Sequence, residues 1–95
     1  MAIHRHKPQY TNDLIASMRR FALAMTGQPG FQRAFSLSDE LSGALIGLAF
    51  WDSKEACKAA MEAAQTAIAD ELFDQWEDAP PEVFRLIPNF EITAD

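Results

Sequence analysis

The stretch GALIGLAFW, from Gly43 to Trp51, is the part of this chain that decides the fold. A continuous apolar run of this length, preceded by Ser42 and followed by a helix-start signal, predicts a β-strand buried on both faces. Such a strand needs a covering layer on each side. The rest of the 95-residue chain provides two helices for one face, so we expect a second copy of the chain to cover the other.

The residues before this stretch predict a strand, a helix and a second strand. Apolar side chains recur at three- and four-residue spacing from Leu14 to Met25, which predicts an amphipathic helix. Thr11 or Asn12 is expected to cap its start, and Gly27 to end it in a left-handed conformation. The two flanking strands are predicted over residues 2–7, before Pro8, and over residues 31–37, where apolar and polar residues alternate.

The residues after the stretch predict a second helix and a last strand. Asp52 or Ser53 caps the helix, with Glu55 in the first turn. The apolar pattern shifts between residues 71 and 76, which indicates a break or a short extra helix before the two prolines at 80 and 81. The last strand is predicted over residues 83–87, and residues 89–93 are expected to continue it along a sheet edge.

This order of elements predicts an α+β protein with a ferredoxin-like βαββαβ fold. Right-handed crossovers then place the first and third strands side by side in a four-stranded antiparallel sheet. Residues 1–95 are expected to form a single domain, whose uncovered sheet face pairs with a second copy in a homodimer.

Composition narrows the choice of partners and compartment. The formal net charge is −6, which argues against binding to nucleic acid or to an anionic membrane surface. Cys57 is the single cysteine, and no apolar run of about 20 residues is present. We therefore expect a cytoplasmic protein whose partners are small molecules or proteins.

Two short motifs resemble the antibiotic biosynthesis monooxygenase (ABM) family of the dimeric α/β barrel superfamily. Pro29-Gly30-Phe31, at the entry to the second strand, is similar to the Pro-Gly-Phe turn of that family. Residues 51–56, WDSKEA, resemble its Trp-x-Ser-x-Glu-Ala pattern at the junction of strand and helix. The spacing of these places and of the flanking elements fits the family over most of the chain.

The resemblance implies a dimeric α/β barrel and a cofactor-independent monooxygenase acting on a small aromatic or quinol-type substrate, in a cleft between sheet and helices. It does not extend to haem binding, because the second helix lacks the histidine that family members often carry after the Glu-Ala pair. The sequence also has no phosphate-binding glycine loop and no paired-cysteine metal motif. If the protein is an enzyme, we therefore expect one that uses neither a cofactor nor a metal.

His4 and His6 are the two histidines and the candidate catalytic residues. Both titrate near neutral pH in their ordinary state, so either is suited to take a proton from a phenol or quinol. Their two-residue spacing puts them on the same side of a strand, roughly 7 Å apart. A metal site would need a third ligand, which the sequence does not offer.

Trp51, Arg33 and Arg85 are the candidate substrate-binding residues. An indole offers an aromatic surface and one N–H donor, although packing in the core is the simpler role. A guanidinium that faces a cavity would stabilise a phenolate, whereas a salt bridge or a contact in the dimer is the alternative. The acidic residues between positions 71 and 82 are interpreted as a solvated face. A surface that holds a partner or gates the cleft is the alternative.

Three classes of function are compatible with the sequence. The first is the cofactor-free oxygenase, which predicts oxygen uptake. The second is a small-ligand carrier or sensor without catalysis, which predicts a bound apolar ligand. The third is a structural dimeric module whose interior is filled by its own side chains, which predicts no ligand.

Overall fold

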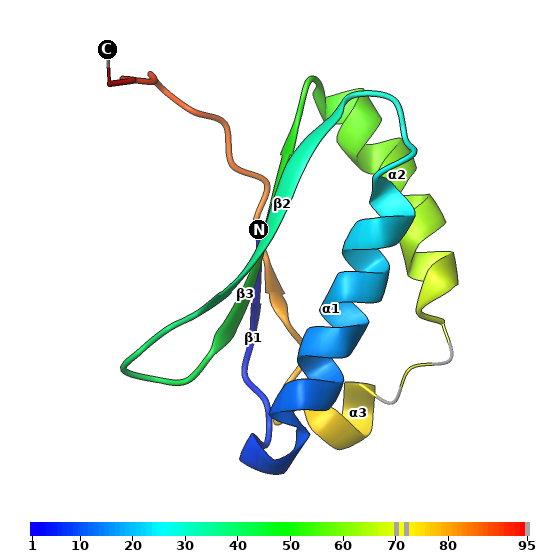
Figure 1. Ribbon diagram of the computed structural model, residues 1–95, viewed down its shortest axis with the longest axis vertical. Helices are drawn as coiled ribbons and strands as arrows, with labels where there is room; N and C mark the ends of the chain where they lie inside the picture. Colours follow the sequence, from blue (N-terminus) through cyan, green and yellow to red (C-terminus); the bar gives the residue numbers. More distant parts are fainter. Residues whose placement is uncertain (70, 72, 95) are drawn as a thin grey trace.

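One four-stranded sheet with two long helices on one face makes up the protein (Figure 1). The structure is a computed structural model, and it describes residues 1–69, 71 and 73–94. The elements in chain order are β1 (Ala2–His4), the 3₁₀ turn η1 (Pro8–Tyr10), α1 (Thr11–Met25), β2 (Phe31–Ser38), β3 (Leu45–Trp51), α2 (Lys54–Ala67), α3 (Phe73–Trp76) and β4 (Glu82–Val83).

The strand order is β2-β3-β1-β4, and every neighbouring pair is antiparallel. The first and third strands are adjacent, with His4 opposite Leu45 and Ala2 opposite Gly47. This is the arrangement of a ferredoxin-like fold, and it confirms the predicted α+β class. The apolar stretch from Gly43 to Trp51 contains β3, which lies between β1 and β2 within the sheet.

The helices begin where short polar side chains or a 3₁₀ turn precede them. Ser53 caps α2, because its side chain accepts a hydrogen bond from the N–H of Ala56 at 3.1 Å. For α1 the expected cap was wrong: η1 runs directly into the helix, and Tyr10 occupies the cap position. Thr11 is already helical, and its hydroxyl donates to the carbonyl of Pro8 instead.

The predicted glycine at the end of α1 was also wrong. The residue after Met25 is Thr26 in a right-handed conformation, and the left-handed glycine is Gly30, with φ of 84°. A β-carbon on Gly30 would lie 2.6 Å from that of Ala56. The turn before β2 therefore needs a glycine both for its backbone conformation and for the close approach of α2.

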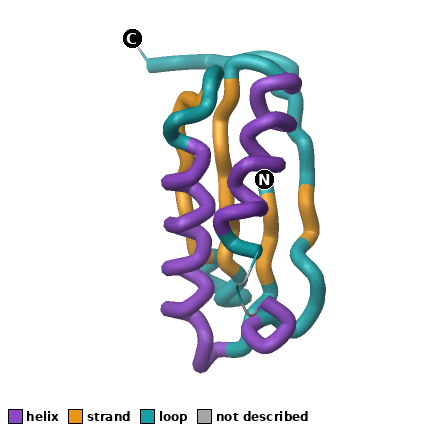
Figure 2. Tube along the Cα trace, turned by 90° about the vertical axis from the view of Figure 1, so that its right-hand side faces the viewer, coloured by secondary structure: helices purple, strands orange, loops and turns teal. Residues whose placement is uncertain are grey.

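The core lies between the sheet and the helices, which stand in front of the strands in Figure 2. One cluster, near α3, consists of Leu14, Leu45 and Trp76, with Leu45 only 1% exposed. A second cluster, at the other end of β3, combines Met25 with the small residues Ala60 and Ala64 of α2. Alanines on α2 leave room for aromatic side chains from the sheet.

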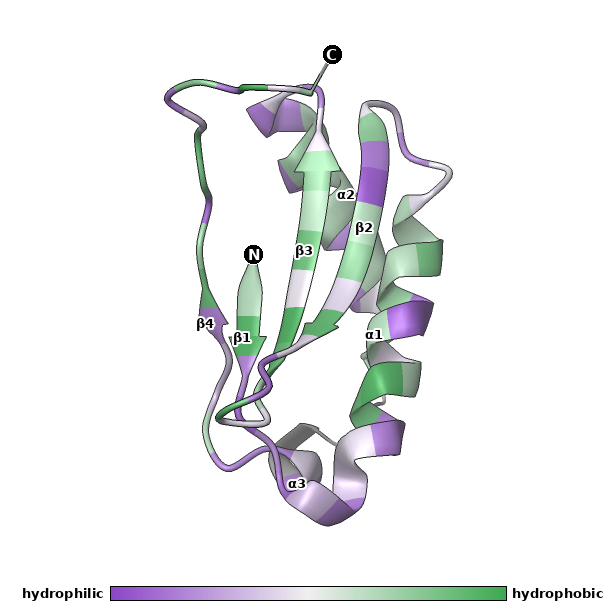
Figure 3. Ribbon diagram, turned by 60° about the vertical axis from the view of Figure 1, so that its left-hand side comes forward, coloured by the Kyte–Doolittle hydropathy of each residue, from purple (hydrophilic) through white to green (hydrophobic). Residues whose placement is uncertain are grey.

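The other face of the sheet has no helix over it, as Figure 3 shows with the strands in front. We call this surface the open face, and it includes Ile46, Leu48 and Phe50 of β3, which alternate with the helix-facing Leu45. On β2, Phe35 is 45% and Leu37 42% exposed. Thus β3 is apolar on both sides as predicted, but this chain covers only one side.

The last strand is shorter than expected. β4 comprises Glu82 and Val83, and residues 84–94, predicted in part as strand, are in no strand. They form a segment that leaves the sheet on the side away from the helices (Figure 1). Likewise, the predicted first strand over residues 2–7 ends at His4. Both differences concern residues for which one chain supplies little or no neighbouring strand.

Candidate functional site

A buried pair of His4 and Glu77 is the most chemically distinctive feature of the core. The Nδ1 of His4 lies 2.6 Å from Oε1 of Glu77, and the two side chains are only 13% and 4% exposed. His4 projects toward the helices because it is the register partner of Leu45, whose side chain is in the core. The pair therefore lies beside an apolar cluster rather than in bulk solvent.

Backbone pairing beyond β1 brings Glu77 to this position. The N–H of Lys7 donates to the carbonyl of Trp76 at 2.8 Å, and that of Asp78 to the carbonyl of Arg5 at 2.9 Å. These bonds set His6 opposite Glu77 in an isolated bridge. Glu77 thus follows α3 on a short antiparallel segment that directs its carboxylate inward, where a buried charge requires a hydrogen-bonded partner.

The geometry assigns a role to each nitrogen of His4. A carboxylate only accepts hydrogen bonds, so with Glu77 ionised the proton of the imidazole is on Nδ1. Among the residues that the structure describes, Nε2 has no hydrogen-bond partner. In the neutral ring this atom carries the lone pair. A carboxylate that fixes the tautomer and leaves the far nitrogen free is the arrangement of a general base.

His6 is held differently. Its Nε2 lies 2.8 Å from the hydroxyl of Thr11, which donates its own proton to Pro8. Thr11 must therefore accept from His6, and the neutral ring carries its proton on Nε2. The remaining Nδ1 is buried and has no partner in the described part of the chain. His6 anchors the turn before α1 through Nε2, whereas His4 is held through Nδ1 by the buried carboxylate of Glu77.

Trp51 lies at the far end of the same face. Its ring packs edge-on against Phe31, with centroids 5.2 Å apart, and joins the cluster around Met25. Leu45, beside His4, is the first residue of β3 and Trp51 the last, so the seven-residue strand separates them by about 20 Å. The indole Nε1 is buried without a partner among described residues. It is a donor, but not one within reach of His4.

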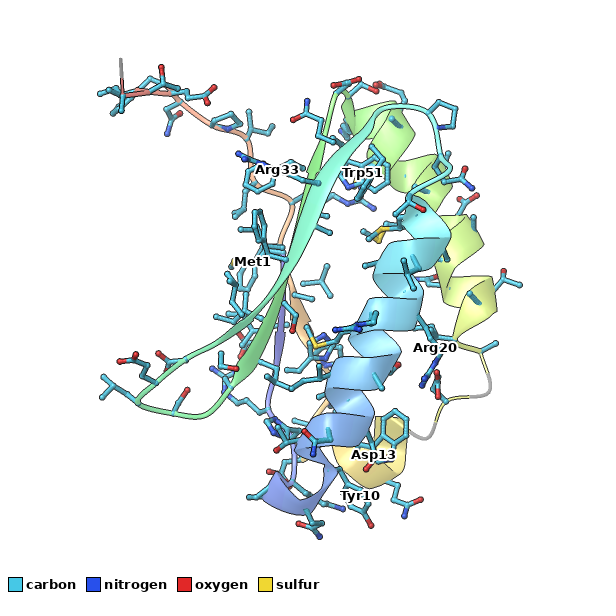
Figure 4. All side chains as sticks on the ribbon, viewed as in Figure 1. Met1, Tyr10, Asp13, Arg20, Arg33 and Trp51 are labelled. Atoms are coloured by element: carbon cyan, nitrogen blue, oxygen red, sulfur yellow. The ribbon has the colours of Figure 1, made fainter. Side chains whose placement is uncertain are left out.

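The two candidate arginines lie outside this face. Arg33 projects from the open face (Figure 4), where its guanidinium lies 4.7 Å from the ring centroid of Phe50 and 5.8 Å from that of Phe35. Arg85 is exposed in the segment that follows β4. Within one chain the structure therefore does not bring Trp51, Arg33 or Arg85 together with His4.

Sequence reasoning missed Glu77. It was grouped with an acidic solvated face, an interpretation that is wrong for this residue, which is 7% exposed. Two of its acidic neighbours do fit surface roles: Glu71 pairs with Arg20, and Glu82 with Arg5 at 2.7 Å. The usable signal was the aromatic residue just before it, because Trp76 had to turn inward and placed its neighbour at the edge of the core.

The described residues include no candidate metal site and no membrane-spanning helix. They contain no group of three or more His, Cys, Asp or Glu side chains able to hold a metal ion. No helix in the same part of the chain has the length and apolar character needed to cross a membrane. Cys57 is a free, half-buried thiol on α2.

Comparison with known proteins identifies a structural neighbour. No protein-family model matches the chain, and no curated protein matches its sequence. Among solved structures, that of Rv0793 from Mycobacterium tuberculosis is similar, with a TM-score of 0.81 over 97% of this chain and 94% of the other. The two sequences are 16% identical. At that identity, the likeness establishes the shared fold.

Proposed function

We propose that this protein is an ABM-like, cofactor-independent monooxygenase that acts on a small hydroxylated aromatic or quinol-type substrate, with His4 as the general base. The observation that carries the proposal is the buried His4–Glu77 pair, which leaves Nε2 without a partner among the described residues. The motifs Pro29-Gly30-Phe31 and WDSKEA (51–56) add the resemblance to the ABM family.

The chemistry requires the base to remove a phenolic proton. The resulting phenolate is electron-rich and is the form that reacts with molecular oxygen, which is the oxidant. Conversion of a hydroxyarene to a quinone is balanced by one O₂: one oxygen atom becomes the new carbonyl, the other leaves as water, and the substrate supplies all four electrons. Glu77 remains ionised throughout, accepts the hydrogen bond from Nδ1–H of His4 and stabilises the imidazolium form of that residue.

The surroundings of His4 suit an aromatic substrate. Leu45 lies opposite it, Trp76 directly precedes Glu77, and Leu14 packs against both apolar residues. Apolar walls with few polar groups are typical of small-molecule sites. Trp51 packs in the apolar cluster around Met25. Neither Arg33 nor Arg85 is assigned to the substrate at His4, because both arginines lie away from it.

The proposal includes a homodimer that buries the open face. Phe35 and Leu37 on β2, and Phe84 just after β4, are each at least 40% exposed. Exposed apolar side chains on one face of a sheet are typical of interaction sites. A second copy supplies the same surface, as an isologous contact requires. Two sheets packed face to face in this way form a dimeric α/β barrel.

The test measures oxygen consumption with a panel of hydroxylated aromatics and quinols, followed by product mass after turnover in ¹⁸O₂. Enzymatic oxidation should add one ¹⁸O atom, and His4→Gln should lower the rate about 100-fold or more. His6→Gln is the matched control, because it changes the neighbouring histidine that is bound to Thr11. Equal losses in both variants, or no oxygen uptake with any substrate, would contradict the proposal.

A ligand carrier without catalysis is the second candidate, and the buried, unpartnered Nε1 of Trp51 favours it. That N–H suits an apolar ligand with one acceptor atom, held near Phe31 and Met25. Native mass spectrometry of gently purified protein distinguishes the two: a retained small molecule without oxygen uptake supports the carrier, whereas turnover that depends on His4 supports the enzyme.

A further inference from the structure

Ser17 is a buried serine on α1 whose hydroxyl group the fold does not use. The residue is only 1% exposed, and its Oγ has no hydrogen-bond partner among the described residues. Thr66 on α2 shows the usual alternative, because its hydroxyl donates to the carbonyl of Glu62, four residues back. A buried hydroxyl without a partner lowers stability, and a ligand with an acceptor atom would supply the missing hydrogen bond.

Gly47 is a second residue that the fold does not require. It lies in the interior of β3, opposite Ala2 on one side and Ser36 on the other. Its φ is not positive, so its backbone conformation is open to other residues. A β-carbon at this position would lie 3.5 Å from the methyl carbon of Met18, which is an ordinary van der Waals distance. Glycine weakens the interior of a strand, and it often marks a place where a ligand approaches the backbone closely.

Gly47 and His4 lie on the same face of the sheet, in adjacent rows. His4 is the register partner of Leu45, and Gly47 follows Leu45 by two residues. Residues two apart on a strand share a face and are separated by about 7 Å. A single aromatic ring with oxygens at opposite ends has a similar length. A ring whose phenolic oxygen meets Nε2 of His4 is therefore able to lie against Gly47.

Helix α1 covers these two rows. Leu14 packs against Leu45, and the methyl carbon of Met18 is the side-chain atom nearest to the α-carbon side of Gly47 that faces the helix. Ser17 follows Leu14 by three residues and directly precedes Met18, so it lies on the buried side of the helix between these contacts. The half-buried Met18 is unbranched and flexible, and it is the side chain best suited to move aside for a ligand.

We propose that Ser17 and Gly47 are specificity-determining residues for the site at His4. The ring of the substrate lies against Gly47 once Met18 has turned aside, and the hydroxyl group of Ser17 donates a hydrogen bond to an oxygen at the end of the ring opposite His4. The inference rests on the proposed function, which places a phenolic oxygen at His4. It narrows the substrate to a ring with oxygens at two opposite positions.

Two phenols of nearly the same shape test the role of Ser17. 4-Methoxyphenol has an acceptor oxygen opposite its hydroxyl group, and 4-ethylphenol has a methylene group in its place. Dissociation constants are measured by calorimetry without oxygen, so that turnover plays no part. The wild-type protein should bind 4-methoxyphenol about tenfold more tightly, and Ser17→Ala should lose this preference. Equal binding or no binding by the wild type, or a preference that persists in Ser17→Ala, would overturn the proposal.

Gly47→Ala tests the position of the ring. The added methyl group should weaken the binding of both phenols about tenfold and leave the preference between them intact. Neither Gly47→Ala nor Ser17→Ala should lower the melting temperature of the free protein, because each removes a feature that disfavours the folded chain. Unchanged binding by Gly47→Ala would reject the placement of the ring, and a clear fall in the melting temperature of Ser17→Ala would show that its hydroxyl group has a structural role instead.

The comparison with oxygen uptake separates this inference from the proposed function. A preference that depends on Ser17, in a protein that consumes no oxygen, would keep the binding site and reject the oxygenase. Oxygen uptake that depends on His4, without any preference between the two phenols, would keep the oxygenase and reject the roles of Ser17 and Gly47.

Discussion

The two faces of the sheet are both apolar, but they are completed in different ways. On the helix-covered face, Leu45 is in contact with Leu14 and Trp76 and is almost fully buried. On the open face, Phe35 and Leu37 keep nearly half of their surface exposed. The covered face also contains a buried polar pair, His4 and Glu77. One face therefore forms the chain's own core, whereas the other is the surface that we propose for assembly.

The largest effect is expected from a cavity on the covered face. Leu14→Ala removes a fully buried side chain and should lower the free energy of unfolding by about 2–5 kcal/mol. Leu37→Ala, on the open face, is the control and should cost less than about 1 kcal/mol in dilute, monomeric protein. Urea denaturation measures both. Similar losses would mean that the two faces do not differ in the isolated chain.

A charge on the open face should act on assembly rather than on folding. Leu48 is opposite Phe35 on β3, and Leu48→Asp is expected to raise the dimer dissociation constant about 100-fold by placing an unpaired carboxylate in the apolar interface. Sedimentation analysis over a concentration series gives this value. A variant that dimerises as well as the wild type would show that the open face is not the interface.

Glu77 and Glu82 pair with residues at the end of β1, one in a buried ion pair and the other in an exposed one, so their contributions to stability can be compared. Glu77→Ala removes the partner of a buried histidine and should cost about 1–3 kcal/mol of stability. Glu82→Ala breaks the exposed pair with Arg5 and should cost less than about 1 kcal/mol. Thermal unfolding of both variants tests the difference. A larger loss of stability in Glu82→Ala than in Glu77→Ala would contradict the stabilising role of the buried pair.

Two glycines with positive φ, Gly30 and Gly43, differ in the packing around them and can be compared directly. Gly30→Ala combines an unfavourable backbone conformation with a clash against Ala56, and should cost about 2 kcal/mol or more. Gly43→Ala has the same type of φ but open space around it, so only about 1 kcal/mol is expected. Equal losses in the free energy of unfolding, measured by chemical denaturation, would show that the close approach of α2 to Gly30 does not add to the cost.

The smallest effect concerns the exposed loop between β2 and β3. Hydrogen bonds from the hydroxyl and then the N–H of Ser42 hold the pKa of Asp39 below its usual value. The loop is thus stabilised above the unfolded pKa and loses this contribution as pH falls through the folded pKa. NMR titration of the Ser42 amide should show that transition, and Asp39→Asn should abolish it. A titration at the ordinary pKa would contradict it.

Local patterns in the sequence were sufficient for the elements that are covered by neighbours. The alternation across β2, the apolar β3 and the spacing along α1 all predicted the observed structure. The site was less accessible, because His4 and Glu77 are 73 positions apart and no local pattern links them. The strand prediction was wrong for residues 85–93 for a different reason. Their pattern is that of a strand, but a strand forms only where a neighbouring strand is present.

The pairing of β1 has a consequence for the order of folding. This strand lies between β3 and β4, so its partners are found at residues 45–47 and 82–83. Closing such long loops is slow compared with forming the β2–β3 hairpin, which needs one short turn. The helices and hairpin are therefore expected to form before β1 enters the sheet. Until then, His4 remains hydrated and without its carboxylate, so the pair to which we attribute catalysis is completed late in folding.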